Sequence, residues 1–446
     1  MNTSFKFLIF VLAGALCLMF DAFYNGFPIV YSDTSTYIVS GFEFEPPFDR
    51  PITYGLFLRL FSLNGLSLWF VCFFQSLILS YLIFLLVRLT IGEKSFLQFG
   101  LLTIIFLSLF TGLSWTVSQL MPDVFTSIAL LCTALILLGT FKKTTSILLY
   151  ILFFISVAMH MSHVVLFSLI LTTLIGLKKF VLPKKDYPKS IFQVTTLLLF
   201  TITTIVTMGS AIAKSKHVFF MGAMVEHGIV KKYLDDTCDY KQFKLCAYKD
   251  SLPDKAYKFI WDEKSPFYKI GGWKETKSEF DEIIYGTLTQ PKYIGIHIQE
   301  SFKATLQQLA LFAIGDGNGS FLKGTLLYER VAHYFPNDLT YYCSSKQNKN
   351  QLDFITIFNS AFAFVIVSSF LLLPLLLTNL THILNSNLKL ITILFFIGIL
   401  LNAWDCGTFA NASDRLGCKI VWLIPFVTMI MFWRILQNRK RNVDQI

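Results

Sequence analysis

Long apolar runs are the feature of this sequence that most constrains its fold. Several of them extend over about 18 or more residues, long enough for a helix to cross a hydrocarbon core of roughly 30 Å. Hydrocarbon offers no partner to an unpaired backbone N–H or C=O group, so each run must be a helix. The chain is therefore predicted to be an all-α polytopic membrane protein.

The composition excludes other classes of protein. Of the 446 residues, 54% are hydrophobic and 15% charged, and the mean hydropathy is +0.60. Soluble domains are nearer 25% charged. A soluble enzyme, a disordered chain and a nucleic-acid-binding domain are excluded. The net charge of +10 is not a nucleic-acid footprint, because most Lys and Arg residues lie at the ends of apolar runs.

The runs predict about ten membrane spans. The first is interpreted as an uncleaved helix and not a signal peptide, because its small-residue triplet at 13–15 lies inside the run. The expected spans are residues 6–25, 64–88, 97–113, 123–140, 145–160, 164–178, 190–213, 353–377, 387–404 and 418–436.

Basic residues predict the orientation, because cytoplasmic loops are enriched in Lys and Arg. With ten spans, the richest basic loops fall on the side of both termini. These loops include Lys6, Arg88, Lys142, Lys178, Lys389 and Arg434. We therefore expect a multi-pass protein of the cell inner membrane with cytoplasmic termini. The predicted parts are an N-terminal bundle (1–213), an external segment (214–352) and C-terminal helices (353–446).

The cysteines divide by predicted location. Three lie within spans and are expected to pack as small apolar residues. Five fall on the external side, where Cys238–Cys246 and Cys406–Cys418 are expected as disulfides if that side is oxidising, and Cys343 is left over. The C-x-x-C spacing of zinc or redox motifs is absent, so no metal-ligating residue is assigned.

Polar residues gather at the predicted outer ends of spans. They are Asp33 with Tyr37, Asp49 with Arg50, Asp123 after Pro122, His160 with His163, and Asp405 with Asp414 and Arg415. Each has a structural alternative. Asp33, Asp49 and Asp123 could cap helices, the histidines could be boundary residues, and Asp414–Arg415 could be a local ion pair.

These residue types suit group transfer from a lipid-linked phosphate donor. A carboxylate can take the proton of an acceptor hydroxyl or amine. Arginine matches a phosphate bidentately, and histidine can assist. A bundle of helices provides an apolar groove for a polyprenyl tail. The chain has no GxxxxGK[ST] motif, so an ATP-driven pump is not expected.

The pattern resembles the GT-C glycosyltransferases, which include protein O-mannosyltransferases and the aminoarabinose transferase of lipid A. The resemblance rests on Asp33 in the first external loop, on the amphipathic segment 55–61 and on Pro122-Asp123. It covers roughly residues 1–215, followed by a large external segment and C-terminal helices in a familiar order. Thr34 follows Asp33, whereas the family often has a second acid there.

The resemblance implies a polyprenyl-phosphate-linked sugar as donor and an envelope glycan, lipid or protein as acceptor. Asp33 would be the catalytic acid or base, and Asp123 a supporting carboxylate. The residues implied in substrate or phosphate binding are Tyr37, Arg50, His160, His163 and Arg415. The resemblance assigns no definite cofactor and leaves a divalent metal open. The other partners are membrane lipids, and no nucleic acid is expected.

Three other functions compete with this interpretation. A lipid-linked polysaccharide polymerase or ligase would use a similar donor but usually has a larger Arg-rich external loop. A transporter or flippase would place charges near the middle of spans and often shows internal repeats, and neither feature is evident in the sequence. A non-catalytic assembly factor or receptor is the fourth alternative.

Overall fold

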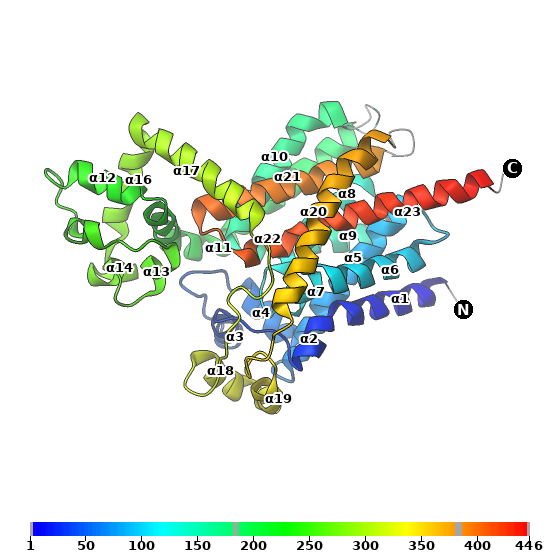
Figure 1. Ribbon diagram of the computed structural model, residues 1–446, viewed down its shortest axis with the longest axis horizontal. Helices are drawn as coiled ribbons and strands as arrows, with labels where there is room; N and C mark the ends of the chain where they lie inside the picture. The colour runs from blue at the N-terminus through cyan, green and yellow to red at the C-terminus, as the bar shows by residue number, and fades with distance from the viewer. Residues whose placement is uncertain (1–2, 182–184, 186, 380–385, 444–446) are drawn as a thin grey trace.

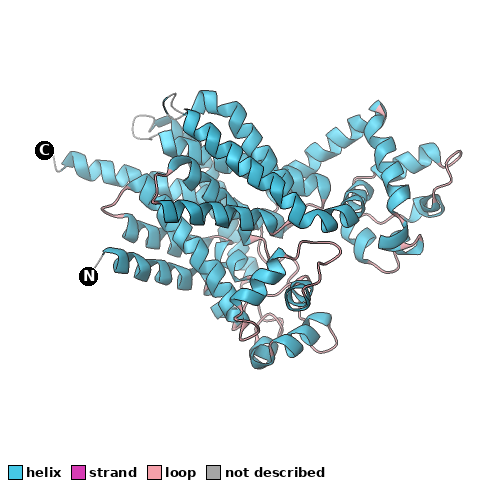
Figure 2. Cartoon of the chain, turned by 180° about the vertical axis from the view of Figure 1, so that it is seen from behind, coloured by secondary structure: helices cyan, strands magenta, loops and turns pink. Residues whose placement is uncertain are grey.

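The computed structural model describes residues 3–181, 185, 187–379 and 386–443, and the described residues form helices without any β-strand. Figure 2 shows this all-helical composition from behind. The long helices form one bundle, and groups of short helices project from one end of it (Figure 1). The predicted all-α class is confirmed for these residues.

Six helical stretches are long and apolar enough to cross a membrane. They are Leu68–Ile91 (α5), Met161–Val181 (α10), Lys189–Val206 within α11 (Tyr187–Glu226), Ile355–Leu377 within α20 (Ile355–Asn379), Asn387–Phe409 within α21 (Ser386–Phe409), and Asp414–Gln437 across α22 (Asp414–Val421) and α23 (Leu423–Val443). Four shorter apolar helices accompany them: α1 (Thr3–Leu18), α6 (Phe96–Phe110), α8 (Val124–Leu138) and α9 (Lys143–Ala158). These are the helices of a membrane protein; the count of ten spans stays a prediction.

Two predicted boundaries differ from the observed helices. The expected span 6–25 is divided between α1 and the short α2 (Phe20–Asn25). Gly26 ends α2 in the left-handed conformation, and its N–H donates to the carbonyls of Ala22 and Phe23, a common glycine termination. The seventh run does not end at 213, because α11 continues to Glu226.

The remaining described helices are short. Those of the N-terminal half are α3 (Thr34–Glu43), α4 (Thr53–Phe61) and α7 (Leu113–Ser118). Those that follow α11 are α12 (Ile229–Thr237), α13 (Ala256–Trp261), α14 (Pro266–Lys269), α15 (Gly272–Glu275), α16 (Lys277–Thr289), α17 (Pro291–Ala310), α18 (Leu326–Tyr334) and α19 (Leu339–Ser344), with 3-10 turns at Lys244–Ser251 and Pro336–Asp338.

The predicted external segment 214–352 packs into two different cores. Helices α12–α16 and the adjoining ends of α11 and α17, called here the protruding unit, surround a core that extends from Val218 to Tyr293. In contrast, Ile314, Val331 and Tyr342 belong to the main core of the bundle. Residues 312–352 are therefore a lining of the bundle end and not part of the protruding unit.

Both chain ends lie at the same end of the bundle (Figure 1). The protruding unit and helices α3, α4, α18 and α19 lie at the other end. The loops that carry the predicted site residues are among these elements, so the fold gathers them at one end of the bundle.

Candidate active site

The first loop is attached by its backbone to the residues that precede Asp123. The N–H of Ile29 donates to the carbonyl of Ser118 (2.9 Å), and the N–H of Leu120 donates to the carbonyl of Ile29 (2.9 Å). The hydroxyl of Thr34 also donates to the Leu120 carbonyl (3.2 Å). These bonds hold the loop of Asp33 next to the loop of Asp123.

A buried glutamine holds the same loop from the other side. The Gln347 side-chain amide donates to the carbonyl of Val30 (2.8 Å), and its oxygen accepts from the Val30 N–H (3.0 Å). The backbone N–H of Gln347 donates to Asn25 (2.7 Å). Sequence reasoning missed Gln347, because nothing in its local sequence indicates a partner more than 300 residues away.

The first charged group of the site is Arg50 with two aspartates. Its guanidinium lies 3.0 Å from the Asp33 carboxylate and also binds Asp49. Asp33 holds the position before α3 but makes no side-chain capping bond. Its side chain is 30% exposed, against 12% for Arg50. In this ion pair the Asp33 carboxylate is therefore the more accessible group, and the Arg50 guanidinium is largely buried.

Tyr37 lies one turn along α3 from Asp33. The Arg50 guanidinium is 5.3 Å from the centre of the Tyr37 ring, a distance typical of a cation–π contact. Burial raises the pKa of Tyr37 well above its ordinary value, and this outweighs the opposing effect of Arg50. The phenol is therefore a neutral hydrogen-bonding group at the base of the site.

The second charged group is an ion pair between residues 292 positions apart. The Arg415 guanidinium donates to the Asp123 carboxylate at 3.2 Å, with side chains 19% and 6% exposed. Asp123 precedes α8 but makes no capping bond. Arg415 also lies 4.5 Å from the centre of the Tyr31 ring. The alternative in which the Asp123 side chain only caps α8 is therefore wrong.

Hydrogen bonds to residues 313 and 316 hold the segment that carries Arg415. Its N–H donates to the Asp316 carboxylate (3.2 Å), and Asp414 accepts from the N–H of Ala313 (2.8 Å). Among the described residues Asp414 makes no ion pair with Arg415. The alternative of a local Asp414–Arg415 pair is therefore wrong.

The two charged groups belong to one site. The tyrosines Tyr31 and Tyr37 each lie close enough to Asp33, Asp123 and Arg415 to interact electrostatically with all three. We call this set the paired-charge site; its members are Tyr31, Asp33, Tyr37, Asp49, Arg50, Asp123 and Arg415. It combines the partly exposed carboxylate of Asp33 with two guanidinium groups.

The two predicted histidines have different surroundings. His163 is buried, and its ring bonds to the Ser156 carbonyl through Nδ1 (2.8 Å) and to the Thr126 hydroxyl through Nε2 (2.8 Å). A carbonyl only accepts, so we assign the proton to Nδ1 and let Nε2 accept from Thr126. This leaves His163 no free ring nitrogen for a phosphate.

His160 lies in the turn before α10 and is half-buried. Its Nδ1 is 2.9 Å from the Ser162 hydroxyl. Burial lowers the pKa of His160 to about 3, and the nearby cations Lys419, Arg415 and Arg50 lower it further. His160 is therefore neutral near pH 7 and can contact a phosphate only as a neutral hydrogen-bonding group.

A buried acid and a buried base lie beside His160. Asp405 is 3% and Lys419 is 2% exposed. Among the described residues no carboxylate lies within 4.0 Å of the Lys419 ammonium group, and Oδ2 of Asp405 has no hydrogen-bond partner. Lys419 is therefore a buried lysine beside the turn of His160 that the sequence did not single out.

One of the two predicted disulfides is formed. Cys238 and Cys246 are bonded to each other. Cys406 and Cys418 are free and buried, so the second predicted bridge is wrong. Their thiols point to different partners: Cys406 contacts Asn402 on its own helix (3.8 Å), and Cys418 contacts the Gly112 carbonyl (3.6 Å).

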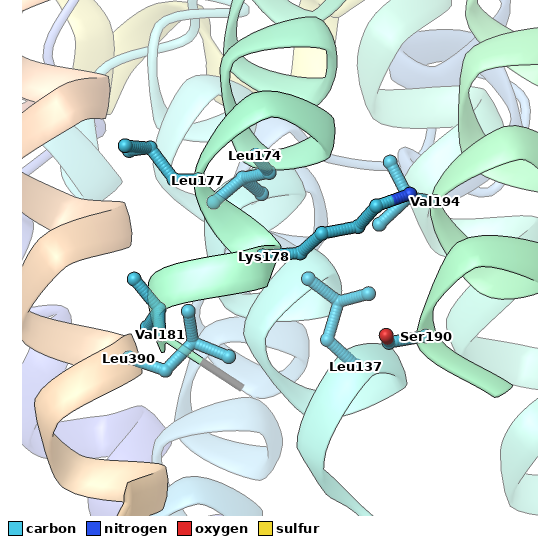
Figure 3. A pocket seen from close by; sticks show the side chains of 8 residues that line it. All are labelled: Leu137, Leu174, Leu177, Lys178, Val181, Ser190, Val194 and Leu390. Carbon is cyan, nitrogen blue, oxygen red and sulfur yellow. The ribbon is translucent and has the colours of Figure 1, made fainter. Parts of the chain in front are cut away.

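Metal-ligating groups and internal cavities bear on which ligands the described part of the chain can hold. No group of three His, Cys, Asp or Glu side chains there could hold a metal ion. A small apolar cavity of about 10 Å³ lies between α8, α10, α11 and α21 (Figure 3). Its lining residue Lys178 is about 25 Å along α10 from the His160 end, and the cavity has room for little more than one water.

Comparison with known proteins identifies no relative. No protein-family model, no curated protein and no solved structure matches the chain. Function must therefore be inferred from the paired-charge site and its place in the fold.

Proposed function

We propose that the protein is an integral membrane glycosyltransferase. It would move a sugar from a polyprenyl-phosphate donor to an envelope glycan, lipid or protein on the external face. The observation that carries the proposal is the paired-charge site: two arginine–aspartate groups joined by two tyrosines at one end of an apolar helical bundle.

Asp33 is proposed as the general base. It is the most exposed of the three paired carboxylates, at 30% against 13% for Asp49 and 6% for Asp123. The acceptor oxygen would form a bond to the anomeric carbon of the sugar, while the bond from that carbon to the phosphate oxygen breaks. The acceptor proton passes to Asp33, and the lipid phosphate leaves with its negative charge.

Arg50 and Arg415 are proposed to hold the phosphate before and after transfer. A guanidinium presents two parallel N–H donors to a phosphate, and both groups remain charged at any accessible pH. Asp49 and Asp123 would keep these side chains oriented while the substrate is absent. Tyr37 and the neutral His160 would supply further hydrogen bonds.

The proposed setting is the cell inner membrane, with both termini cytoplasmic. Two observations support it: basic residues are enriched on the loops expected at the side of the termini, and the termini lie at the bundle end away from α3 and α4 (Figure 1). The paired-charge site would then face outward, where a lipid-linked donor needs no cytosolic nucleotide. The GT-C resemblance belongs to this proposal and leaves a divalent metal open.

The test is transfer by the Asp33→Asn variant in proteoliposomes supplied with a membrane lipid extract. Loss of a general base lowers rates by roughly 10²–10⁴-fold, and Asp33 makes no capping bond whose loss would unfold α3. We expect normal expression and thermal stability with transfer at or below one hundredth of wild type. Ser35→Ala, a half-buried neighbour on the same turn whose hydroxyl donates to the Ser32 carbonyl, is the matched control.

Two results would contradict the proposal. The first is wild-type transfer by Asp33→Asn. The second is translocation of intact polyprenyl-phosphate sugar across the vesicle by the wild-type protein with no transfer, which would indicate a flippase.

A further inference from the structure

Four aromatic side chains meet where the loop after α3 touches the protruding unit. We call them the aromatic platform: Phe48 in the loop, Phe219 on α11, Trp261 at the end of α13 and Trp273 on α15. The Trp273 ring lies 5.6 Å from Phe48, 5.7 Å from Trp261 and 6.1 Å from Phe219, between ring centres. Trp273 is therefore the centre of the platform.

The platform is not a closed core. Trp261 is 47% and Phe48 is 41% exposed, whereas Phe259 and Phe267 of the same unit are fully buried. Exposed apolar surface costs about 25 cal/mol per Å² relative to burial, and clustered exposed aromatic rings mark interaction sites more often than single ones do. The rim is charged, since Asp262 follows Trp261 and Lys274 follows Trp273, both exposed.

The platform adjoins the paired-charge site. Phe48 is followed directly by Asp49 and Arg50, and two residues of extended chain span at most about 7 Å. Arg50 reaches Asp33 at 3.0 Å. The platform and the proposed base are thus connected through the short segment from Phe48 to Arg50.

We infer that the aromatic platform binds the saccharide part of the acceptor. The face of an aromatic ring is electron-rich and its edge electron-poor, so the polarised C–H groups on one face of a sugar ring stack on it. The indole N–H groups make no hydrogen bond within the described part of the chain and can donate to sugar hydroxyls. The charged rim favours a polar occupant over a hydrocarbon tail. This inference rests on the proposed function and names its acceptor class.

The test measures binding alone, with the full-length protein in detergent micelles applied to an array of defined oligosaccharides. We expect the wild-type protein to bind a subset of them, and Trp261→Ala to bind that subset about ten-fold more weakly, as expected for loss of one aromatic stacking partner. Trp273→Leu should show the same loss. Tyr285→Ala, a 70% exposed aromatic of the same unit outside the platform, is the matched control.

The inference is overturned if the wild-type protein binds no saccharide, if both tryptophan variants bind as wild type, or if they lose polyprenyl-phosphate binding instead. The array involves no chemistry, so its outcome is separate from that of Asp33→Asn. If saccharide binding depends on Trp261 while Asp33→Asn still gives full transfer, the proposed role of the platform stands and the proposed role of Asp33 is refuted.

Discussion

Asp33 and Asp123 each hold the position before a helix, yet neither side chain caps it. Each carboxylate instead binds an arginine. A cap contributes about 1 kcal/mol, whereas removing Asp123 from its largely buried pair with Arg415 costs several times more. Asp33 is 30% exposed, and its loss leaves Arg50 bound to Asp49. At this scale the choice between capping and ion pairing depends on whether a distant guanidinium reaches the carboxylate.

His163 and His160 differ in a way that mutation can measure. His163→Ala removes the ring that bonds the Ser156 carbonyl and the Thr126 hydroxyl. We expect it to lower the free energy of unfolding by about 1–3 kcal/mol. His160→Ala should leave the unfolding midpoint nearly unchanged and reduce transfer. The measurements are thermal unfolding and transfer in the same detergent. Equal stability of the two variants would contradict a scaffolding role for His163.

At the scale of elements, the crossing of α3 and α4 positions Arg50 against Asp33. The two helices meet at glycines: a Cβ on Gly41 would lie 2.1 Å from the Gly55 carbonyl oxygen, and one on Gly55 would lie 2.3 Å from the Ser40 hydroxyl. Glycine is therefore required by close approach and not by backbone conformation. The loop between these helices carries Phe48, Asp49 and Arg50.

Gly41→Ala should separate α3 from α4. Because the contact is with backbone, it cannot be relieved by a rotamer change, and overpacking of this kind costs about 1–3 kcal/mol. We expect a lower unfolding midpoint and a loss of transfer. Gly176→Ala on α10, where an added Cβ meets nothing within 4 Å, is the control and should be neutral or stabilising. If the Gly41→Ala variant were as stable and active as this control, the close approach of α3 and α4 at Gly41 would be refuted.

The protruding unit should lose stability on acidification. Burial lowers the pKa values of His217, His227 and His297. For His217, the nearby Asp281 raises the pKa, while Lys277 and Lys216 lower it further. In the unfolded chain each histidine has a pKa near 6.5. Below neutral pH the unfolded chain therefore binds more protons than the folded unit, so the stability of the unit falls as pH falls. The loss is at most about 2 kcal/mol per histidine between pH 6.5 and 5.

Hydrogen exchange of peptides from α12–α16 at pH 7 and pH 5, corrected for the intrinsic rate, measures this effect. His217→Leu should reduce the pH dependence because it removes one titrating group from the buried face of α11. Protection that is unchanged or increased at pH 5 would show that the histidines do not govern the unit.

At the scale of the whole molecule, the chain forms two hydrophobic cores with the paired-charge site at the end of the larger one. Residues 312–352 return from the protruding unit to that core and bring Gln347 to the first loop. Phe48, in the loop after α3, contacts Trp273 of the protruding unit. The paired-charge site therefore depends on segments from nearly the full length of the chain.

The proposed orientation predicts which end is reached from outside the cell. An impermeant maleimide applied to intact cells should label a cysteine at Lys277, which is exposed on α16 of the protruding unit, but not one at Lys143, at the start of α9. Permeabilised cells should give labelling at both positions. Labelling of the wild-type protein is subtracted, because it measures the reaction of the native cysteines. Labelling at Lys143 alone would reverse the orientation and place the paired-charge site in the cytosol.

The sequence by itself determined the class of the protein and the residues of interest. Apolar runs predicted helices because hydrocarbon permits little else, and the short separation of Cys238 and Cys246 favoured the bridge that is formed. These features depend on local composition and spacing. Asp33, Arg50, Asp123 and Arg415 were recognised for the same reason, as charged residues beside apolar runs.

Only the tertiary structure decided what those residues contact. Asp123 meets Arg415 across 292 positions, His163 turns both ring nitrogens to neighbours inside the bundle, and Cys418 faces Gly112 and not Cys406. A carboxylate before a helix is compatible with a cap or with an ion pair, and local sequence does not distinguish them. The outcome depends on which distant group packing brings within hydrogen-bonding range, since that range is only about 3 Å.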